Sequence, residues 1–220
     1  MSKRAVLKTN DGIDIAADYY PGTTDKAALL LHMMSTTRES WRDFALLLTD
    51  QGYHVLAIDL RGHGESTGGP ERYKTFTDEE HQKYIADVHI GIQFLESRGI
   101  KQDAIVMFGA SIGANLALWY LSEHSEVRQA VLLSPGLNYR GIVAKSFVRR
   151  LTEGQRVFFI ASEDDEKWYG NCAKMSHELF NLVPEGVEAK FLAYKNSGHG
   201  THMFGKEKPD LAQEIMRWIH

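Results

Sequence analysis

One stretch of sequence decides the fold: Ala104-Ile105-Val106-Met107-Phe108-Gly109-Ala110-Ser111-Ile112-Gly113-Ala114-Asn115-Leu116. It begins with an unbroken apolar run at 104–108, which is typical of a strand buried on both faces of a sheet. A Gly-x-Ser-x-Gly turn follows at 109–113, and the pattern after it favours a helix. So sharp a turn holds its central serine in strained backbone geometry, and small residues two before and two after it prevent a clash. We therefore expect Ser111 at the carboxyl end of a buried strand, beside the free N–H groups that open the helix.

The rest of the chain alternates short apolar or β-branched runs with longer segments of helical period, which predicts βαβ units and a mostly parallel sheet. The N-terminal segment differs, because Asn10-Asp11-Gly12 favours an antiparallel hairpin at a sheet edge. The expected strands are 5–9, 13–20, 27–31, 55–59, 104–108, 130–133, 157–160 and 189–194. The expected helices are 40–50, 77–99, 112–123, 166–182 and 210–219, with a short one near 142–150.

The composition is that of an ordinary globular protein: 220 residues, 43% hydrophobic and 25% charged. This length favours a single domain over 1–220, and an evenly spread net charge of −4 argues against a nucleic-acid partner. The single cysteine, Cys172, excludes an internal disulfide and a thiolate zinc cluster. No secretory signal opens the chain, and no apolar run approaches the roughly 18 residues that span a bilayer. We therefore expect a cytoplasmic protein without a membrane span.

A serine hydroxyl becomes a good nucleophile only when a base takes its proton. His199 lies in Asn196-Ser197-Gly198-His199-Gly200, a loop directly after the last expected strand, on the side of the sheet where Ser111 emerges. His202, three residues later, is the alternative base. His63 lies in Arg61-Gly62-His63-Gly64-Glu65-Ser66 and is interpreted as a structural histidine that holds its own turn.

The acid that orients this base should follow another strand between Ser111 and His199. The run Glu163-Asp164-Asp165-Glu166 follows the strand expected at 157–160. Asp164 is favoured because it comes first at the inward-turning part of the loop, and Asp165 is the alternative. The other acids of the run suit the start of a helix, where negative charge is stabilised.

A tetrahedral oxyanion needs a second N–H donor from elsewhere in the chain. The strand expected at 27–31 ends in the loop His32-Met33-Met34-Ser35-Thr36, whose backbone amides can face Ser111.

Taken together, these landmarks resemble the α/β-hydrolase fold over nearly the whole chain, from Ile13 to Ile219. They are Leu31-His32, the run from Asp59 to Ser66, the turn at 109–113, the acid loop at 161–165 and Ser197-Gly198-His199-Gly200, in the family's order of serine, acid and histidine. The resemblance implies a three-layer α/β/α sandwich with an eight-stranded, mostly parallel sheet and a Ser111–His199–Asp164 triad. It also implies oxyanion donors at the amides of Ile112 and Met34; because the family commonly has glycine where Met33 stands, Met33 remains an alternative donor.

Many members of this family insert a helical lid where the present chain has only 21 residues, between Ser134 and Arg156. We therefore expect a short insertion at about 135–155, a largely open cleft, and substrates with small or accessible acyl groups. The cations of this segment are interpreted as a solvated face, with a dock for an acidic substrate as the alternative; they are Arg140, Lys145, Arg149 and Arg150.

The sequence thus predicts a serine hydrolase of carboxylic esters or thioesters that acts on a small-molecule acyl substrate through an acyl-enzyme, with no metal or organic cofactor. Amide or peptide cleavage by the same triad is the alternative activity, and a catalytically silent scaffold is the alternative outside enzymes. A dehalogenase is disfavoured, because that chemistry places an aspartate where Ser111 stands. The oligomeric state is left open.

Overall fold

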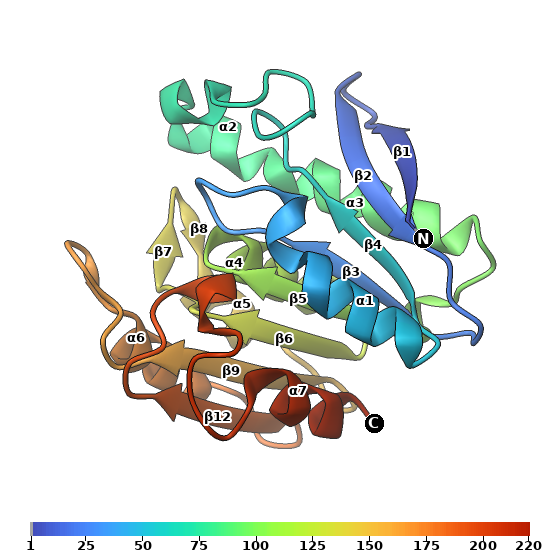
Figure 1. Cartoon of the computed structure of the whole chain (residues 1–220). Coiled ribbons are helices and arrows are strands. Elements are labelled where there is room, and N and C mark those ends of the chain that lie inside the picture. The colour runs from blue at the N-terminus through green and yellow to red at the C-terminus, as the bar shows by residue number, and fades with distance from the viewer. Residues whose placement is uncertain (1) are drawn as a thin grey trace.

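In the computed structural model, which describes residues 2–220, eight of the strands form one central sheet (Figure 1). Its eight strands lie in the order β1 (Lys3–Lys8), β2 (Asp14–Tyr20), β4 (His54–Ile58), β3 (Ala27–Leu31), β5 (Ile105–Ala110), β6 (Gln129–Leu133), β9 (Arg156–Ser162) and β12 (Glu188–Tyr194). The first three strands in this order pair antiparallel, and every later pair is parallel. The expected sheet is therefore confirmed, including the antiparallel hairpin at its edge.

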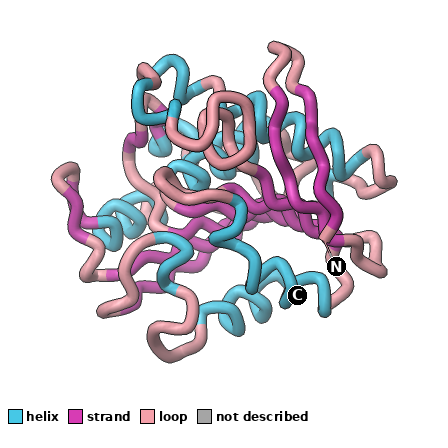
Figure 2. The backbone as a smooth tube through the Cα atoms, turned by 45° about the horizontal axis from the view of Figure 1, so that its top comes forward, coloured by secondary structure: helices cyan, strands magenta, loops and turns pink. Residues whose placement is uncertain are grey.

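Helices cover both faces of the sheet, as Figures 1 and 2 show. One face carries α1 (Arg42–Asp50) and α7 (Leu211–Ile219), and the other carries α3 (Tyr84–Glu96), α4 (Ile112–Glu123), α5 (Ala144–Val148) and α6 (Cys172–Phe180). Short 3₁₀ turns are η1 (Arg38–Trp41), η2 (Arg72–Thr75), η3 (Gln102–Ala104) and η4 (Gly200–Met203). Within residues 2–220, no helix combines the length and the apolar character needed to cross a bilayer.

Strand β3 shows why the sheet needs cover on both sides. Leu29 and Leu31 belong to the core beneath α3 and α4, whereas Ala28 and Leu30 belong to the core beneath α1 and α7. Successive side chains of a strand point to opposite faces, so a run that is apolar at every position can be buried only between two layers. Each fully buried leucine contributes about 1.5–3 kcal/mol.

The helix expected at 77–99 is two helices, α2 (Asp78–Gln82) and α3, which meet at Lys83. Its start is confirmed: Thr77 Oγ1 accepts a hydrogen bond from the Glu80 amide, and the Glu80 carboxylate accepts one from the Thr77 amide. This reciprocal capping satisfies two N–H groups that have no partner inside the helix.

The helix expected at 166–182 is wrong over its first third. There the chain forms a two-stranded ribbon, β10 (Glu166–Lys167) and β11 (Gly170–Asn171), and helix α6 begins only at Cys172. Gly170 has a φ of 129°, which a regular helix excludes, and the Asn171 side chain caps α6 instead. A second ribbon, β7 (Asn138–Tyr139) and β8 (Ile142–Val143), precedes α5, so the short helix expected near 142–150 is confirmed only over residues 144–148.

The loop after β4 is held by a buried carboxylate. Asp59 accepts hydrogen bonds from the amides of Arg38 and Glu65, at 2.8 and 2.9 Å, and pairs with the Arg38 guanidinium. A Cβ on Gly64 would lie 2.0 Å from the Asp59 carboxylate, so only glycine fits there. The motif at 59–66 therefore builds a rigid turn.

The structural interpretation of His63 is confirmed. Its ring is buried, stacks on Tyr73 with ring centroids 4.0 Å apart, and hydrogen bonds through Nδ1 to the Arg61 carbonyl. His32 is buried beside it, with Nδ1 on the Met33 carbonyl and Nε2 accepting from the Leu60 amide. Burial lowers the pKa of His32 to about 4, and burial together with the neighbouring His32 lowers that of His63 to about 3.

These two histidines should make the folded state sensitive to acid. Between pH 6.5 and about 4 the unfolded chain binds protons at both rings and the folded chain does not, so the free energy of unfolding falls as the pH falls. The slope is up to about 1.4 kcal/mol per pH unit for each histidine. His63→Phe keeps the stacking on Tyr73 and should remove one such contribution, as measured by urea unfolding between pH 7.5 and 4.5. An unchanged slope in this variant would show that His63 titrates normally.

Candidate active site

Ser111 stands at the turn between β5 and α4, with a φ of 54° and a ψ of −118°. A side chain in this backbone region is strained, and the surroundings hold it there. A Cβ on Gly109 would lie 2.1 Å from the Gly113 carbonyl oxygen, and a Cβ on Gly113 would lie 2.5 Å from that of Leu31. Both glycines are therefore required so that α4 can turn back over β5 and approach the end of β3.

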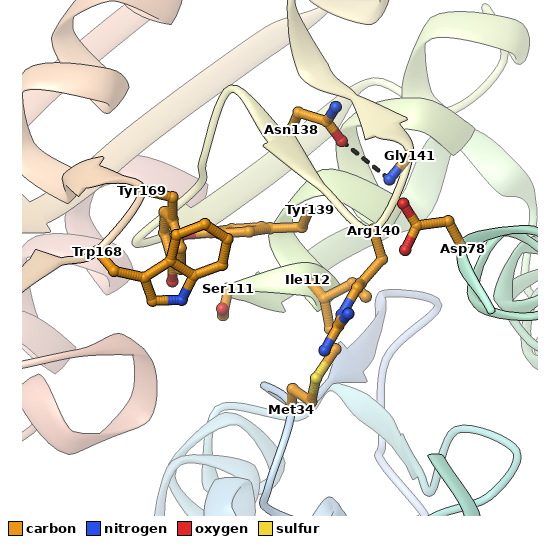
Figure 3. Close-up of a pocket in the computed structure, with 10 residues that line it drawn as sticks. All are labelled: Met34, Asp78, Ser111, Ile112, Asn138, Tyr139, Arg140, Gly141, Trp168 and Tyr169. Atoms are coloured by element: carbon orange, nitrogen blue, oxygen red, sulfur yellow. Dashed lines mark hydrogen bonds between the residues drawn. The ribbon is translucent and has the colours of Figure 1, made fainter. Parts of the chain in front are cut away.

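The Ser111 hydroxyl faces a cavity of about 410 Å³ (Figure 3). Its amide donates to the Leu133 carbonyl at 2.8 Å, whereas its Oγ has no hydrogen-bond partner among residues 2–220. The cavity is lined by Met34, Asp78, Ser111, Ile112, Asn138, Tyr139, Arg140, Gly141, Trp168 and Tyr169. Sequence reasoning placed Ser111 and Met34 near such a site but missed the aromatic side chains, because it took 168–169 for helix.

His199 follows β12 and lies next to the residues that carry Ser111. The Gly200 amide donates to Ser134 Oγ at 3.0 Å, and a Cβ on Gly200 would lie 3.3 Å from that of Ala110, the neighbour of Ser111 in sequence. The loop at 197–200 is thus pressed against the carboxyl end of β5. His202, the alternative base, is exposed on η4, whereas His199 is partly buried; neither histidine is among the residues that line the cavity.

The carboxylate at His199 belongs to Asp165, which corrects the expected pairing with Asp164. The His199 Nδ1 and the Asp165 Oδ2 lie 2.6 Å apart, and the Asp165 side chain is fully buried. A proton on Nδ1, donated to this carboxylate, leaves Nε2 free to accept one.

Asp164 is exposed and points to the neighbouring backbone. Its Oδ1 accepts hydrogen bonds from Ser162 Oγ and from the Gly198 amide, the latter at 3.1 Å. Consecutive residues after a strand point in different directions, so the one that arrives first need not face inward. Asp164 therefore ties down the loop that carries His199, and Asp165 contacts the imidazole itself.

The electrostatics of this pair keep Asp165 ionised. Burial alone would raise the pKa of its carboxyl, but the hydrogen bond and charge of His199, together with Lys167, lower it to about 2. Lys167 Nζ lies 3.1 Å from Asp165 Oδ1. A permanently charged carboxylate can stabilise a positive imidazolium on His199.

One set of side chains here has the spacing of metal ligands. Ligand atoms of Asp165, Cys172 and His199 lie within 4.8 Å of one another. Burial raises the pKa of the Cys172 thiol to about 12, so without a bound ion this group is a neutral thiol. The same burial makes Cys172 a packing residue rather than a nucleophile.

The positions expected to supply oxyanion donors line the same cavity. Met34 and Ile112 both face it, and their amides have no hydrogen-bond acceptor among residues 2–220. Met33 is buried instead, with its sulfur toward Gly200. The approach of Gly113 to the carbonyls of Leu31 and His32 brings the loop after β3 against the start of α4.

Comparison with known proteins agrees with this architecture. Polyketide transferase af380 of Aspergillus fumigatus is 29% identical over 134 residues, which are 60% of this chain and 44% of that protein. Protein ABHD14A of Danio rerio is 28% identical over 121 residues, which are 54% of this chain and 41% of that protein. The chain thus spans less than half the length of these curated relatives.

Solved structures match over a much larger share. The complex of DcsB with its substrate analogue has a TM-score of 0.82 at 16% identity and covers 100% of this chain and 99% of that one. The Pyrococcus furiosus esterase Pf2001 has a TM-score of 0.78 at 18% identity, and the match covers 100% of this chain and 89% of that one. At these identities the likeness establishes the fold.

A family model described as serine aminopeptidase, S33, matches residues 22–169, which include the turn at Ser111 and the acid loop. With its strand order, its strand-to-helix turn at Ser111 and this match, the chain belongs to the serine aminopeptidase S33 family of α/β-hydrolase-fold proteins.

Proposed function

We propose that this protein is a serine hydrolase that cleaves carboxylic esters or thioesters through Ser111, His199 and Asp165. The observation that carries the proposal is the 2.6 Å contact between His199 and the buried Asp165. These residues lie on the loops after β12 and β9, at the same carboxyl edge of the parallel strands as Ser111, which follows β5. Asp165 takes the role that the sequence assigned to Asp164.

In this mechanism the Ser111 hydroxyl attacks the acyl carbon while His199 Nε2 takes its proton. The tetrahedral oxyanion is stabilised by the amides of Ile112 and Met34, and each such donor is worth about 2.7–4 kcal/mol of barrier. His199 then protonates the leaving group, which departs from the acyl-enzyme. Water, activated by the same imidazole, attacks the acyl carbon and releases the acid and free Ser111.

Two features support small or accessible acyl groups. The cavity holds about 410 Å³, at the small end of ligand sites in general. In place of a long helical lid, the segment after β6 forms only the β7–β8 ribbon and the five-residue helix α5. The esterases named among proteins of this fold are consistent with ester cleavage.

Amide cleavage by the same groups is the second candidate, because the family's description names aminopeptidases. An amide leaving group must be protonated by His199 before it departs, so it makes a stronger demand on the imidazole than a phenolate or a thiolate does. Parallel assays with 4-nitrophenyl acetate and an aminoacyl 4-nitroanilide distinguish the two activities by their values of kcat/KM.

Replacement of the proposed nucleophile tests the core of the mechanism. Ser111→Ala should abolish turnover of 4-nitrophenyl acetate and covalent labelling by a fluorophosphonate, in which serine oxygen displaces fluoride from phosphorus. Intact-mass spectrometry measures the labelling. Ser146→Ala, an exposed serine on α5, is the matched control and should keep both properties. Full labelling of Ser111→Ala would defeat the proposal.

Replacing Asp165 should lower kcat far more than replacing its neighbour Asp164. Asp165→Asn should lower kcat on the order of 10⁴-fold, because an amide cannot hold the required tautomer of His199 or stabilise its positive form. Asp164→Asn keeps an oxygen for Ser162 and Gly198, so its loss should stay within about tenfold. The reverse order of effects would assign the acid to Asp164.

A further inference from the structure

Four cations lie in the segment between β6 and β9, and one of them differs in position from its neighbours. Lys145 pairs with Glu178, and Arg150 lies 3.4 Å from Glu123, both on the outside of the helical layer. Arg140 lines the cavity that Ser111 faces. In Figure 3 its side chain runs from the β7–β8 turn toward Met34, beside Ile112.

The Arg140 guanidinium has no carboxylate within 4 Å among residues 2–220. The other charged residue that lines the cavity is Asp78, which lies beyond Arg140 from Ser111 in the view of Figure 3. Asp78 packs against the turn, since a Cβ on Gly141 would lie 3.6 Å from the Asp78 Cβ. A cation without a partner in a cavity attracts an anion from solution, even though the chain as a whole is acidic.

The backbone at Arg140 is unfavourable for arginine. Arg140 and Gly141 have φ values of 54° and 80° and form the two central residues of a tight hairpin, which is the pattern of a type I′ turn. Asparagine or aspartate usually occupies the first of these positions, because their short side chains tolerate positive φ. The hairpin holds its shape through a 2.9 Å hydrogen bond from the Gly141 amide to Asn138 Oδ1. A strained residue at a cavity is typical of a functional position.

The wall opposite Arg140 is aromatic. Trp168, a residue that is 96% exposed, packs edge-on against Tyr169, and Tyr169 packs edge-on against Tyr139. These rings suit an apolar part of a substrate. The cavity therefore offers an apolar wall on one side of Ser111 and a single positive charge on the other (Figure 3).

We infer that Arg140 determines specificity by binding a carboxylate of the substrate, so that the preferred substrates are anionic esters or thioesters. This inference rests on the proposed hydrolase function. One guanidinium with an acid close behind it matches a singly charged carboxylate better than a phosphate, which carries nearly two charges and is usually held by several donors. The carboxylate would lie a few atoms from the scissile carbonyl, on either the acyl or the alcohol side.

Two matched pairs of esters test whether the carboxylate is recognised on the acyl side or on the alcohol side of the scissile bond. On the acyl side, mono-(4-nitrophenyl) adipate is compared with 4-nitrophenyl hexanoate; on the alcohol side, 4-acetoxybenzoate is compared with 4-acetoxybenzamide. Spontaneous hydrolysis is subtracted for each. The wild type should prefer the anionic member of one pair by about tenfold in kcat/KM, the size expected for a charge-assisted hydrogen bond. Added salt should reduce this preference, because Arg140 is exposed.

Arg140→Asn is the informative variant, because asparagine suits the turn and removes the charge. The ratio of anionic to neutral kcat/KM should fall to near one, while the melting temperature stays the same or rises. Arg150→Gln, which removes a cation of the same segment that pairs with Glu123, is the matched control and should keep the wild-type ratio.

Three outcomes would overturn the inference. A wild type that cleaves the neutral esters but shows no preference for a carboxylate in either pair would overturn it and leave the proposed function standing. An unchanged ratio in Arg140→Asn would assign the preference to another residue. A wild type that cleaves no ester and resists fluorophosphonate would overturn the proposed function, and this inference with it.

Discussion

The turn from β5 into α4 is the steric constraint on which the site depends. Ser111 can occupy its strained backbone region only because Gly109 and Gly113 leave room for the helix to cross back over the strand. The same absence of side chains lets α4 approach the carbonyls of Leu31 and His32. These close contacts between helix and sheet therefore fix the turn that carries Ser111 and also place the loop that carries Met34 against the start of α4.

The two aspartates after β9 act on different parts of the opposite loop. Asp164 hydrogen bonds to the Gly198 amide and so fixes the backbone, while Asp165 contacts the His199 imidazole. Because β9 and β12 are parallel neighbours in the sheet, their carboxyl ends bring both acids and the histidine together without a long connection. One carboxylate thus orients the imidazole and the other holds its loop in position, which suits the role of base that we propose for His199.

The sequence predicted the parts that are set by burial and steric size. Strand β3 and helix α4 match their expected bounds, because an all-apolar run and a glycine-flanked serine allow few alternatives. The expected pairing of His199 with Asp164 was wrong because Asp164 and Asp165 are the same residue type and both positions fit the motif, so only the direction of each side chain separates them. The β10–β11 ribbon was missed because its charged and aromatic residues have no strand alternation over two-residue strands, so they were read as the first turn of α6.

The residues that we infer to contact the substrate lie on a different kind of secondary structure from the proposed catalytic residues. Ser111, Asp165 and His199 follow strands of the central eight-stranded sheet, whereas Arg140 and Trp168 lie in the turns of two ribbons whose strands have two residues each. Ribbons this short are stable only through packing against the rest of the protein, and their exposed turns accept substitution at little expense to the fold. Lys167 connects the β10–β11 ribbon to the loop after β9, because it lies on β10 and forms an ion pair with the buried Asp165. A change in the β10–β11 ribbon can therefore alter the ion pair of Lys167 with Asp165, while a change at the β7–β8 turn acts on Arg140, the residue that we infer to select the substrate.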